Sequence, residues 1–221
     1  PFNWTPTKLG ADEEMILSLP AGKRIQALIQ IGLLNELENE IIKINSVMNK
    51  DIAMWSLDIA QHFSLAYTQL KIAGKLRQYS VLLPTKYYYP TPIWQPLNGF
   101  TLDPSLLYAF MHQESMFNTT AKSHRGAMGL MQIMPATAKF ISSNREVKRN
   151  NSNILKIPEI NLDVGQEYIE YLLNLDLISN NLIYLAAAYN GGPGNLQKWL
   201  EKVNHLNDAL FFMESIPSRE T

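Results

Sequence analysis

Apolar residues in this chain recur at intervals of three and four, and almost no stretch alternates apolar and polar residues for long. The first spacing places apolar side chains along one face of an α-helix, whereas strict alternation would indicate a half-buried strand. The helical pattern begins near Ile25, continues through Leu37 and Ile41, and returns in several later segments. The sequence therefore predicts an all-α fold, in which any strand is short and peripheral.

Residue types at the ends of these segments indicate where helices begin. Asp103 followed by Pro104 is typical of an N-cap and a first helical position, and predicts a helix that runs to about residue 116. Asp51, Ser64 and Asn161 are the expected N-caps of three further helices.

The helical pattern breaks at residues 84–98, which contain four prolines and three consecutive tyrosines. Proline lacks the backbone N–H that a helix interior needs, so this stretch cannot be a regular helix. We place a domain boundary here, which divides the chain into residues 1–84 and 85–221. Small residues such as Ala66 and Ala73 in the upstream helices favour close approach of neighbours, as in stacked helical hairpins.

Composition excludes several classes of function. Lys and Arg number 19 against 20 Asp and Glu, for a formal net charge of -1, so we expect no nucleic-acid partner. No stretch approaches the roughly 20 apolar residues of a membrane span. With 0 Cys, disulfides, thiolate zinc sites and cysteine nucleophiles are excluded. The four histidines show no paired spacing, so we expect no metal site, and no cofactor is implied.

One carboxylate is unexplained by local structure. Between residues 59 and 145 the only acidic residues are Asp103, the expected N-cap, and Glu114. On its predicted helix Glu114 shares a face with Leu107, Phe110 and Met111, and an apolar flank disfavours the ionised form. A glutamate that stays partly protonated near neutral pH suits a general acid for a glycosidic oxygen. The alternative is a helix-end glutamate that points outward into solvent.

The same window, residues 59–145, carries eight basic residues. They indicate either a local anionic partner or a solvated face that is offset by the acidic segment at residues 36–40. The sequence leaves both interpretations open.

Four segments together resemble a known family. HQES at residues 112–115, GAMGLMQIMP at 126–135, NLDVG at 161–165 and AYNGGPG at 188–194 occur in the order of the four signature blocks of the soluble lytic murein transglycosylases. The upstream helices, notably around residues 72–76, are similar to the linker domain of that family. The resemblance therefore covers most of the chain.

The resemblance implies a helical linker domain over residues 1–84 and a lysozyme-like α-helical catalytic domain over residues 85–221, which binds glycan in a groove. It implies that Glu114 is the catalytic acid and base, and that Tyr189 donates to its carboxyl group or orients it. The residues that the resemblance places in supporting or sugar-binding roles are Ser115, Ser123, Gln132, Met134 and Asn190. Simpler structural roles remain open: Gly126 and Gly129 can serve turns with positive φ, and Tyr189 can be a core aromatic residue.

Glycosidases that hydrolyse their substrate use two carboxylates, about 5–5.5 Å apart for retention or 6.5–9.5 Å for inversion. Asp163 is a second candidate carboxylate, but its spacing to Glu167 fits a solvated helix face, so we expect it to be structural. One acid suffices if the substrate supplies the nucleophile, because the C6 hydroxyl of a muramyl ring can attack its own C1. The expected reaction cleaves the β-1,4 bond between N-acetylmuramic acid and N-acetylglucosamine without water and forms a 1,6-anhydromuramyl product.

Two other functions remain open at this stage: a lysozyme-like muramidase, which would release reducing ends, and a non-catalytic peptidoglycan-binding module. The resemblance implies peptidoglycan strands with stem peptides as partners, and the periplasm of a Gram-negative bacterium as the location. The chain begins at Pro1 without a visible signal segment. Ser218 stands where the family tends to have an aromatic residue, and the family's N-terminal helical ring is missing. We therefore expect part of the full-length architecture to lie outside this chain.

Overall fold

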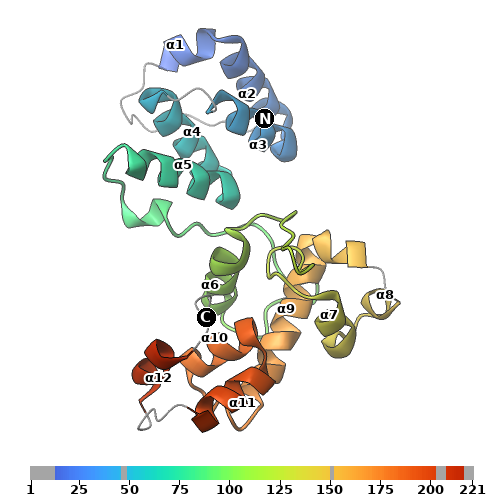
Figure 1. Cartoon of the computed structure of the whole chain (residues 1–221). Coiled ribbons are helices and arrows are strands. Elements are labelled where there is room, and N and C mark those ends of the chain that lie inside the picture. The colour runs from blue at the N-terminus through green and yellow to red at the C-terminus, as the bar shows by residue number, and fades with distance from the viewer. Residues whose placement is uncertain (1–12, 46–48, 150–151, 203–207, 217–221) are drawn as a thin grey trace. The chain divides into compact units, whose positions relative to one another are not determined.

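The computed structural model of the chain describes residues 13–45, 49–149, 152–202 and 208–216 (Figure 1). Within these ranges the regular elements are α- and 3₁₀-helices, and extended residues pair in two isolated bridges, Lys122 with Met128 and Met128 with Ile133. The prediction of an all-α fold is thereby confirmed. None of the described helices combines the length and the apolar character needed to cross a membrane. Ser218 lies outside the described residues.

The chain divides into two compact units. The first comprises the described residues up to Trp94 together with Met116–Asn118, and the second comprises Gln95–Ser115 and the described residues from Thr119 onward. The segment just after residue 84 stays with the first unit, because Gln69 Nε2 donates to the backbone oxygens of Lys86 at 3.1 Å and Tyr87 at 3.2 Å. A functional division between linker and catalytic domains at residues 84/85 remains a prediction.

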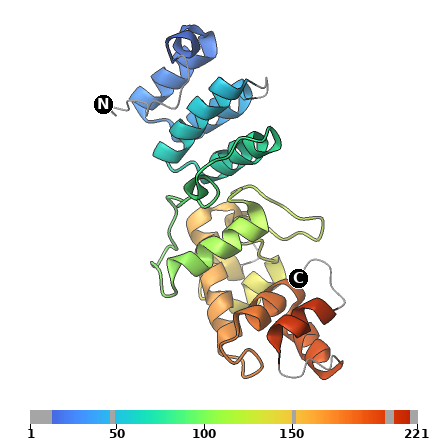
Figure 2. The same cartoon turned by 90° about the vertical axis from the view of Figure 1, so that its left-hand side faces the viewer.

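The first unit is built from consecutive helices that pack in pairs: α1 against α2, α2 against α3, and α4 against α5 (Figures 1 and 2). Side chains from α2, α3 and α4 contribute to its core, including Ile25, Leu37 and Leu57, each with 0% of its surface exposed. These pairs are the predicted helical hairpins. The elements are α1 (Glu13–Ser18), α2 (Pro20–Ile31), α3 (Leu34–Ile44), α4 (Lys50–His62), α5 (Ala66–Gln78) and η1 (Thr85–Tyr87).

Two of the predicted N-caps in this unit are wrong. The cap of α4 is Asn49, whose Oδ1 accepts from the backbone N–H groups of Asp51 at 2.8 Å and Ile52 at 3.2 Å. α5 begins after Leu65, without a side-chain cap, because Ser64 adopts a positive φ of 52° and ends the preceding turn.

Helix α9 is the centre of the second unit, where it contacts α6, α7 and α10 (Figure 1). Every residue from 161 to 166 is buried, so successive turns of α9 face neighbours on more than one side. The predicted cap at Asp103 is confirmed, since its Oδ1 accepts from Ser105 N at 2.8 Å at the start of α6. The elements are α6 (Pro104–Ser115), α7 (Pro135–Ile141), α8 (Arg145–Lys148), η2 (Ser152–Lys156), α9 (Pro158–Leu173), α10 (Leu182–Gly191), α11 (Pro193–Lys202) and α12 (Ala209–Ser215).

Polar side chains of α9 hold the segment that leads into α6. Asp163 accepts from the backbone N of Asn98 at 3.2 Å and from its Nδ2 at 2.7 Å, and Gln166 Oε1 accepts from Thr101 N at 2.9 Å. Asp163 is 7% exposed, so the prediction of a solvated helix face is wrong. Its role in the structure is to fix the entry to α6.

Candidate active site

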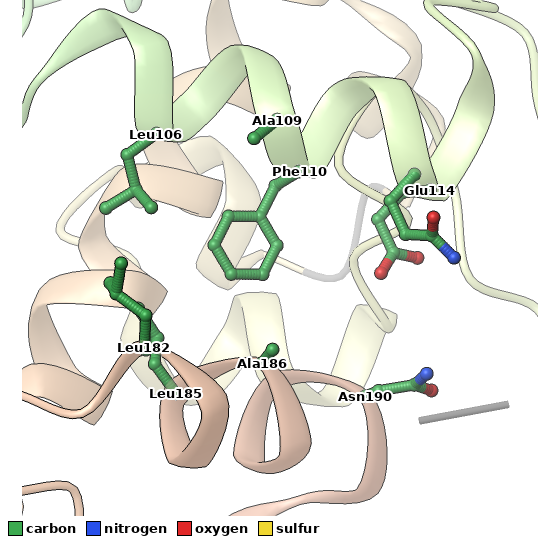
Figure 3. Close-up of a pocket in the computed structure, with 9 residues that line it drawn as sticks. Leu106, Ala109, Phe110, Glu114, Leu182, Leu185, Ala186 and Asn190 are labelled. Atoms are coloured by element: carbon green, nitrogen blue, oxygen red, sulfur yellow. The ribbon is translucent and has the colours of Figure 1, made fainter. Parts of the chain in front are cut away.

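A cavity of about 430 Å³ lies between α6 and α10 (Figure 3). Glu114 reaches into it from the last turn of α6, and Asn190 lies across from it on the last turn of α10. The rest of the lining is mostly apolar and comes from the same two helices: Leu106, Ala109, Phe110, Gln113, Leu182, Leu185 and Ala186.

The apolar surroundings change the acidity of Glu114. Its carboxyl group is half-buried, and loss of solvation raises its pKa from 4.5 to about 7. Burial disfavours the ionised form because the pocket replaces water with hydrocarbon. Near neutral pH the protonated and ionised forms therefore coexist, which lets one group serve as acid and as base.

Tyr189 lies behind the lining of the cavity, where it packs on Phe110. It is 9% exposed, and its ring packs on Phe110 and Tyr168 with centroid distances of 4.4 and 5.2 Å. Burial, followed by the charge of Glu114 and then Tyr168, raises the pKa of Tyr189 well above its ordinary value, so the phenol stays protonated. Its hydroxyl donates to the backbone oxygen of Met131 at 2.7 Å. Any orientation of Glu114 by this hydroxyl would therefore use the lone pairs of its oxygen.

The loop that carries Met131 is held by Asn161. The prediction that Asn161 caps a helix is wrong, because α9 begins three residues earlier at Pro158. Asn161 is instead fully buried: its Oδ1 accepts from Met131 N at 2.7 Å, and its Nδ2 donates to the backbone oxygens of Met128 at 2.9 Å and Leu155 at 2.8 Å. Asn161, which the sequence predicted to begin a helix, therefore anchors a loop about thirty residues away in the chain.

The glycines of this loop allow close approach to α9. Gly126 and Gly129 have positive φ values of 90° and 76°, as predicted. A Cβ atom on Gly129 would lie 2.4 Å from both Asn161 Nδ2 and the Leu155 oxygen. Gly129 is therefore needed for space as well as for conformation.

The remaining predicted site residues lie outside the lining of this cavity. Ser115 Oγ donates to Met111 O at 3.1 Å, Ser123 Oγ accepts from Ala127 N at 2.9 Å, and Gln132 Nε2 donates to Gly129 O at 2.9 Å. Met134 precedes α7 as its N-cap residue and is 38% exposed. The structure thus brings Glu114 and Asn190 together in the cavity, with Tyr189 behind them. Ser115, Ser123 and Gln132 instead bond to backbone atoms three or four residues away in the chain.

Much of the apolar lining was missed from the sequence. The face assigned to Glu114 combined two faces of α6: Leu107 and Met111 are 0% exposed in the core, whereas Leu106 and Phe110 line the cavity with Glu114. Spacing of four residues from Leu106 through Phe110 to Glu114 would have identified this second face. Nothing near Glu114 in sequence points to the α10 wall.

Similarity to known proteins agrees with this geometry. The family model described as "Transglycosylase SLT domain" matches residues 92–212. The soluble lytic murein transglycosylase of Salmonella typhimurium is 36% identical over 165 residues, which cover 73% of this chain and 25% of that protein. The protein of the same name from Escherichia coli K12 is 39% identical over 125 residues, which cover 56% of this chain and 19% of that protein.

A solved structure shows the same fold. The crystal structure of the 70 kDa soluble lytic transglycosylase from Escherichia coli matches 98% of this chain and 34% of its own, with a TM-score of 0.71 and 27% sequence identity. This chain therefore spans about a third or less of the length of these relatives. The all-α, lysozyme-like architecture expected from the sequence is the one observed.

Proposed function

The chain belongs to the transglycosylase SLT domain family, and from that membership we propose that it is a peptidoglycan lytic transglycosylase with Glu114 as its catalytic acid and base. The observation that carries the proposal is the half-buried Glu114 carboxyl group in a largely apolar cavity, where its pKa is raised to about 7. The proposed scissile bond is the β-1,4 linkage between N-acetylmuramic acid and N-acetylglucosamine.

In the proposed reaction protonated Glu114 donates its proton to the glycosidic oxygen, and the bond from that oxygen to C1 of the muramyl ring breaks. The carbonyl oxygen of the C2 N-acetyl group stabilises the positive charge that develops at C1. Ionised Glu114 then takes the proton of the C6 hydroxyl group as O6 bonds to C1. The proton count at Glu114 is restored, and no water is consumed. Attack within one ring needs little more than the correct ring shape, since effective molarities of such reactions reach about 10⁵ M or more.

The carboxylate count in the cavity favours this reaction over hydrolysis. Among the described residues that line it, Glu114 is the one carboxylate. Asp163, the other candidate, is buried and bound to Asn98. A hydrolase would need a second carboxylate to supply a nucleophile or to activate water.

The supporting residues have distinct proposed roles. Asn190 faces the cavity opposite Glu114, and its amide can both donate to and accept from sugar substituents. Tyr189 keeps water away from one side of Glu114. Ser115, Ser123, Gln132 and Met134 are proposed to shape the glycan groove, the first three through their backbone hydrogen bonds.

The proposal extends to the setting of the enzyme. Peptidoglycan strands with stem peptides are the proposed partner, and the periplasm is the proposed location, since the named relatives come from Gram-negative bacteria. The paired helices of the first unit are proposed to act as a linker domain ahead of the catalytic domain, with the boundary at residues 84/85.

Mass spectrometry of muropeptides released from purified peptidoglycan tests the function directly. We expect products with 1,6-anhydromuramic acid, which are lighter than hydrolytic products by one water, about 18 Da. Glu114→Gln should abolish release while retaining glycan binding, because the amide has nearly the same shape but no proton to transfer.

A matched control is Glu201→Gln, an identical change at an exposed position of α11. It should release products at the wild-type rate. Reducing-end products from the wild type would instead indicate a hydrolase, and substantial turnover by Glu114→Gln would refute the assignment of Glu114.

A further inference from the structure

The side-chain amide of Asn161 forms all of its hydrogen bonds with backbone atoms. A carboxamide offers two N–H donors and a carbonyl acceptor. In Asn161 the acceptor binds Met131 N, and the donors serve the oxygens of Met128 and Leu155, all between 2.7 and 2.9 Å. The side chain is 0% exposed, so water cannot replace any of these bonds. Aspartate lacks the donors and leucine lacks every polar group, so neither reproduces this pattern.

Met131 is held from both sides of its backbone. Its N–H donates to Asn161, and its carbonyl oxygen accepts from the Tyr189 hydroxyl at 2.7 Å. The side chain of Met131 also packs closely against α9 at Gly165. A Cβ atom at that position would lie only 2.7 Å from Met131 Cγ. The position of Met131 is thus fixed by α9, and it fixes the Tyr189 hydroxyl in turn.

Tyr189 links the position of Met131 to the surroundings of Glu114. Its ring packs on Phe110, one turn before Glu114 on α6, at a centroid distance of 4.4 Å, and the charge of Glu114 contributes to the raised pKa of Tyr189. A displaced Tyr189 would open a path for water to the carboxyl group. Solvation of that group would favour its ionised form.

We propose that Asn161 is a positioning residue for the reaction: through Met131 it holds Tyr189 against Phe110, and this packing behind the cavity keeps water from Glu114. The inference rests on the proposed function for the role of Glu114, although its effect on the carboxyl group is measurable without turnover.

The test uses Asn161→Ala with Asp163→Ala as its matched control. Both positions are buried polar anchors on α9, but Asp163 binds Asn98 at the entry to α6 and does not contact Met131. The readouts are thermal stability, the pKa of Glu114 from ¹³C NMR titration of its carboxyl carbon, and the pH profile of muropeptide release.

Both variants should lose stability. Asn161→Ala should also lower the pKa of Glu114 by about one unit, and at pH 8, above both pKa values, it should reduce kcat by about tenfold because the protonated fraction falls by that factor. Asp163→Ala should leave that pKa and kcat unchanged when measured well below its melting temperature. An unchanged pKa of Glu114 in Asn161→Ala, or an equal shift in both variants, would overturn the proposal.

Tyr189→Phe tests the same chain of contacts from its other end, and does so even if Asn161→Ala fails to fold. It should also lower the pKa of Glu114, and its effect should be non-additive with that of Asn161→Ala. An unchanged pKa of Glu114 in Tyr189→Phe would refute the link through Met131. Failure of the proposed function would look different. In that case the wild-type protein would release no anhydromuramyl products, but the pKa of Glu114 could still be compared by NMR between the wild type and the variants.

Discussion

At the scale of single residues, Glu114 shows what sequence reasoning can and cannot reach. The scarcity of acids around it and the apolar residues on its helix predicted a raised pKa, and the structure has its pKa at about 7. The surroundings were partly misassigned, since Leu107 and Met111 belong to the core and the α10 residues that line the cavity with Glu114 are far away in sequence. The chemistry of a residue can thus be predicted from its neighbours in sequence even when its actual surroundings cannot.

The pKa of Glu114 makes the stability of the protein depend on pH. Its folded-state pKa of about 7 exceeds the ordinary 4.5, so the native state favours the protonated form. Stability from this group is fully present below pH 4.5 and is lost as the pH rises through about 7. Glu114→Gln should therefore be more stable than the wild type at pH 8 by about 1 to 2 kcal/mol, a figure reduced for partial solvent screening.

Urea unfolding of both proteins at pH 4.5 and pH 8 measures this difference. The gain from Glu114→Gln should be present at pH 8 and nearly absent at pH 4.5. The same gain at both pH values would show that packing, and not ionisation, is responsible.

At the scale of elements, α6 has one face in the core and another that lines the cavity, and the adjacent residues Leu107 and Leu106 lie on different faces. Leu107 is 0% exposed in the core, whereas its neighbour Leu106 is half-buried and lines the cavity. Leu107→Ala should cost about 2–5 kcal/mol of unfolding free energy, because it leaves a buried cavity. Leu106→Ala should cost about 1 kcal/mol and should instead raise KM for glycan by widening the pocket.

Urea unfolding and steady-state kinetics of this pair check the division of α6. The two variants remove the same atoms from adjacent positions, so each is the control for the other. Equal losses of stability would contradict the assignment of the two faces.

Helix positions were predictable from periodicity, but several caps were not. Asp103 caps α6 as predicted, whereas Asn49 caps α4 in place of Asp51. Both Asn49 and Asp51 suit a cap, and local sequence alone cannot choose between them. Asn161 was misread for a deeper reason: its partners Met128 and Met131 lie about thirty residues away, where no rule based on neighbouring residues applies.

At the scale of the whole molecule, each compact unit has a core of its own. The sequence indicated two parts from the prolines at residues 84–98, but which unit keeps that segment depends on Gln69, whose partners follow it by 17 and 18 residues. Leu57 and Leu172 are both 0% exposed, the first in α4 and the second in α9. Removing either side chain should therefore weaken mainly its own unit.

Hydrogen exchange read by mass spectrometry tests this separation. Leu57→Ala should accelerate amide exchange in α2 to α5 and leave α9 and α10 protected, and Leu172→Ala should do the reverse. Uniform acceleration across both units in either variant would mean that the chain unfolds as one cooperative block.

The wall opposite Glu114 has a consequence for the newly made chain. During synthesis Glu114 emerges well before α10, which supplies Leu182, Leu185 and Asn190. Until α10 has been translated and packed, the carboxyl group faces water and has the acidity of an ordinary glutamate. The order of residues along the chain thus delays the rise in pKa, so a nascent or prematurely terminated polypeptide carries Glu114 without the raised pKa that the proposed reaction needs.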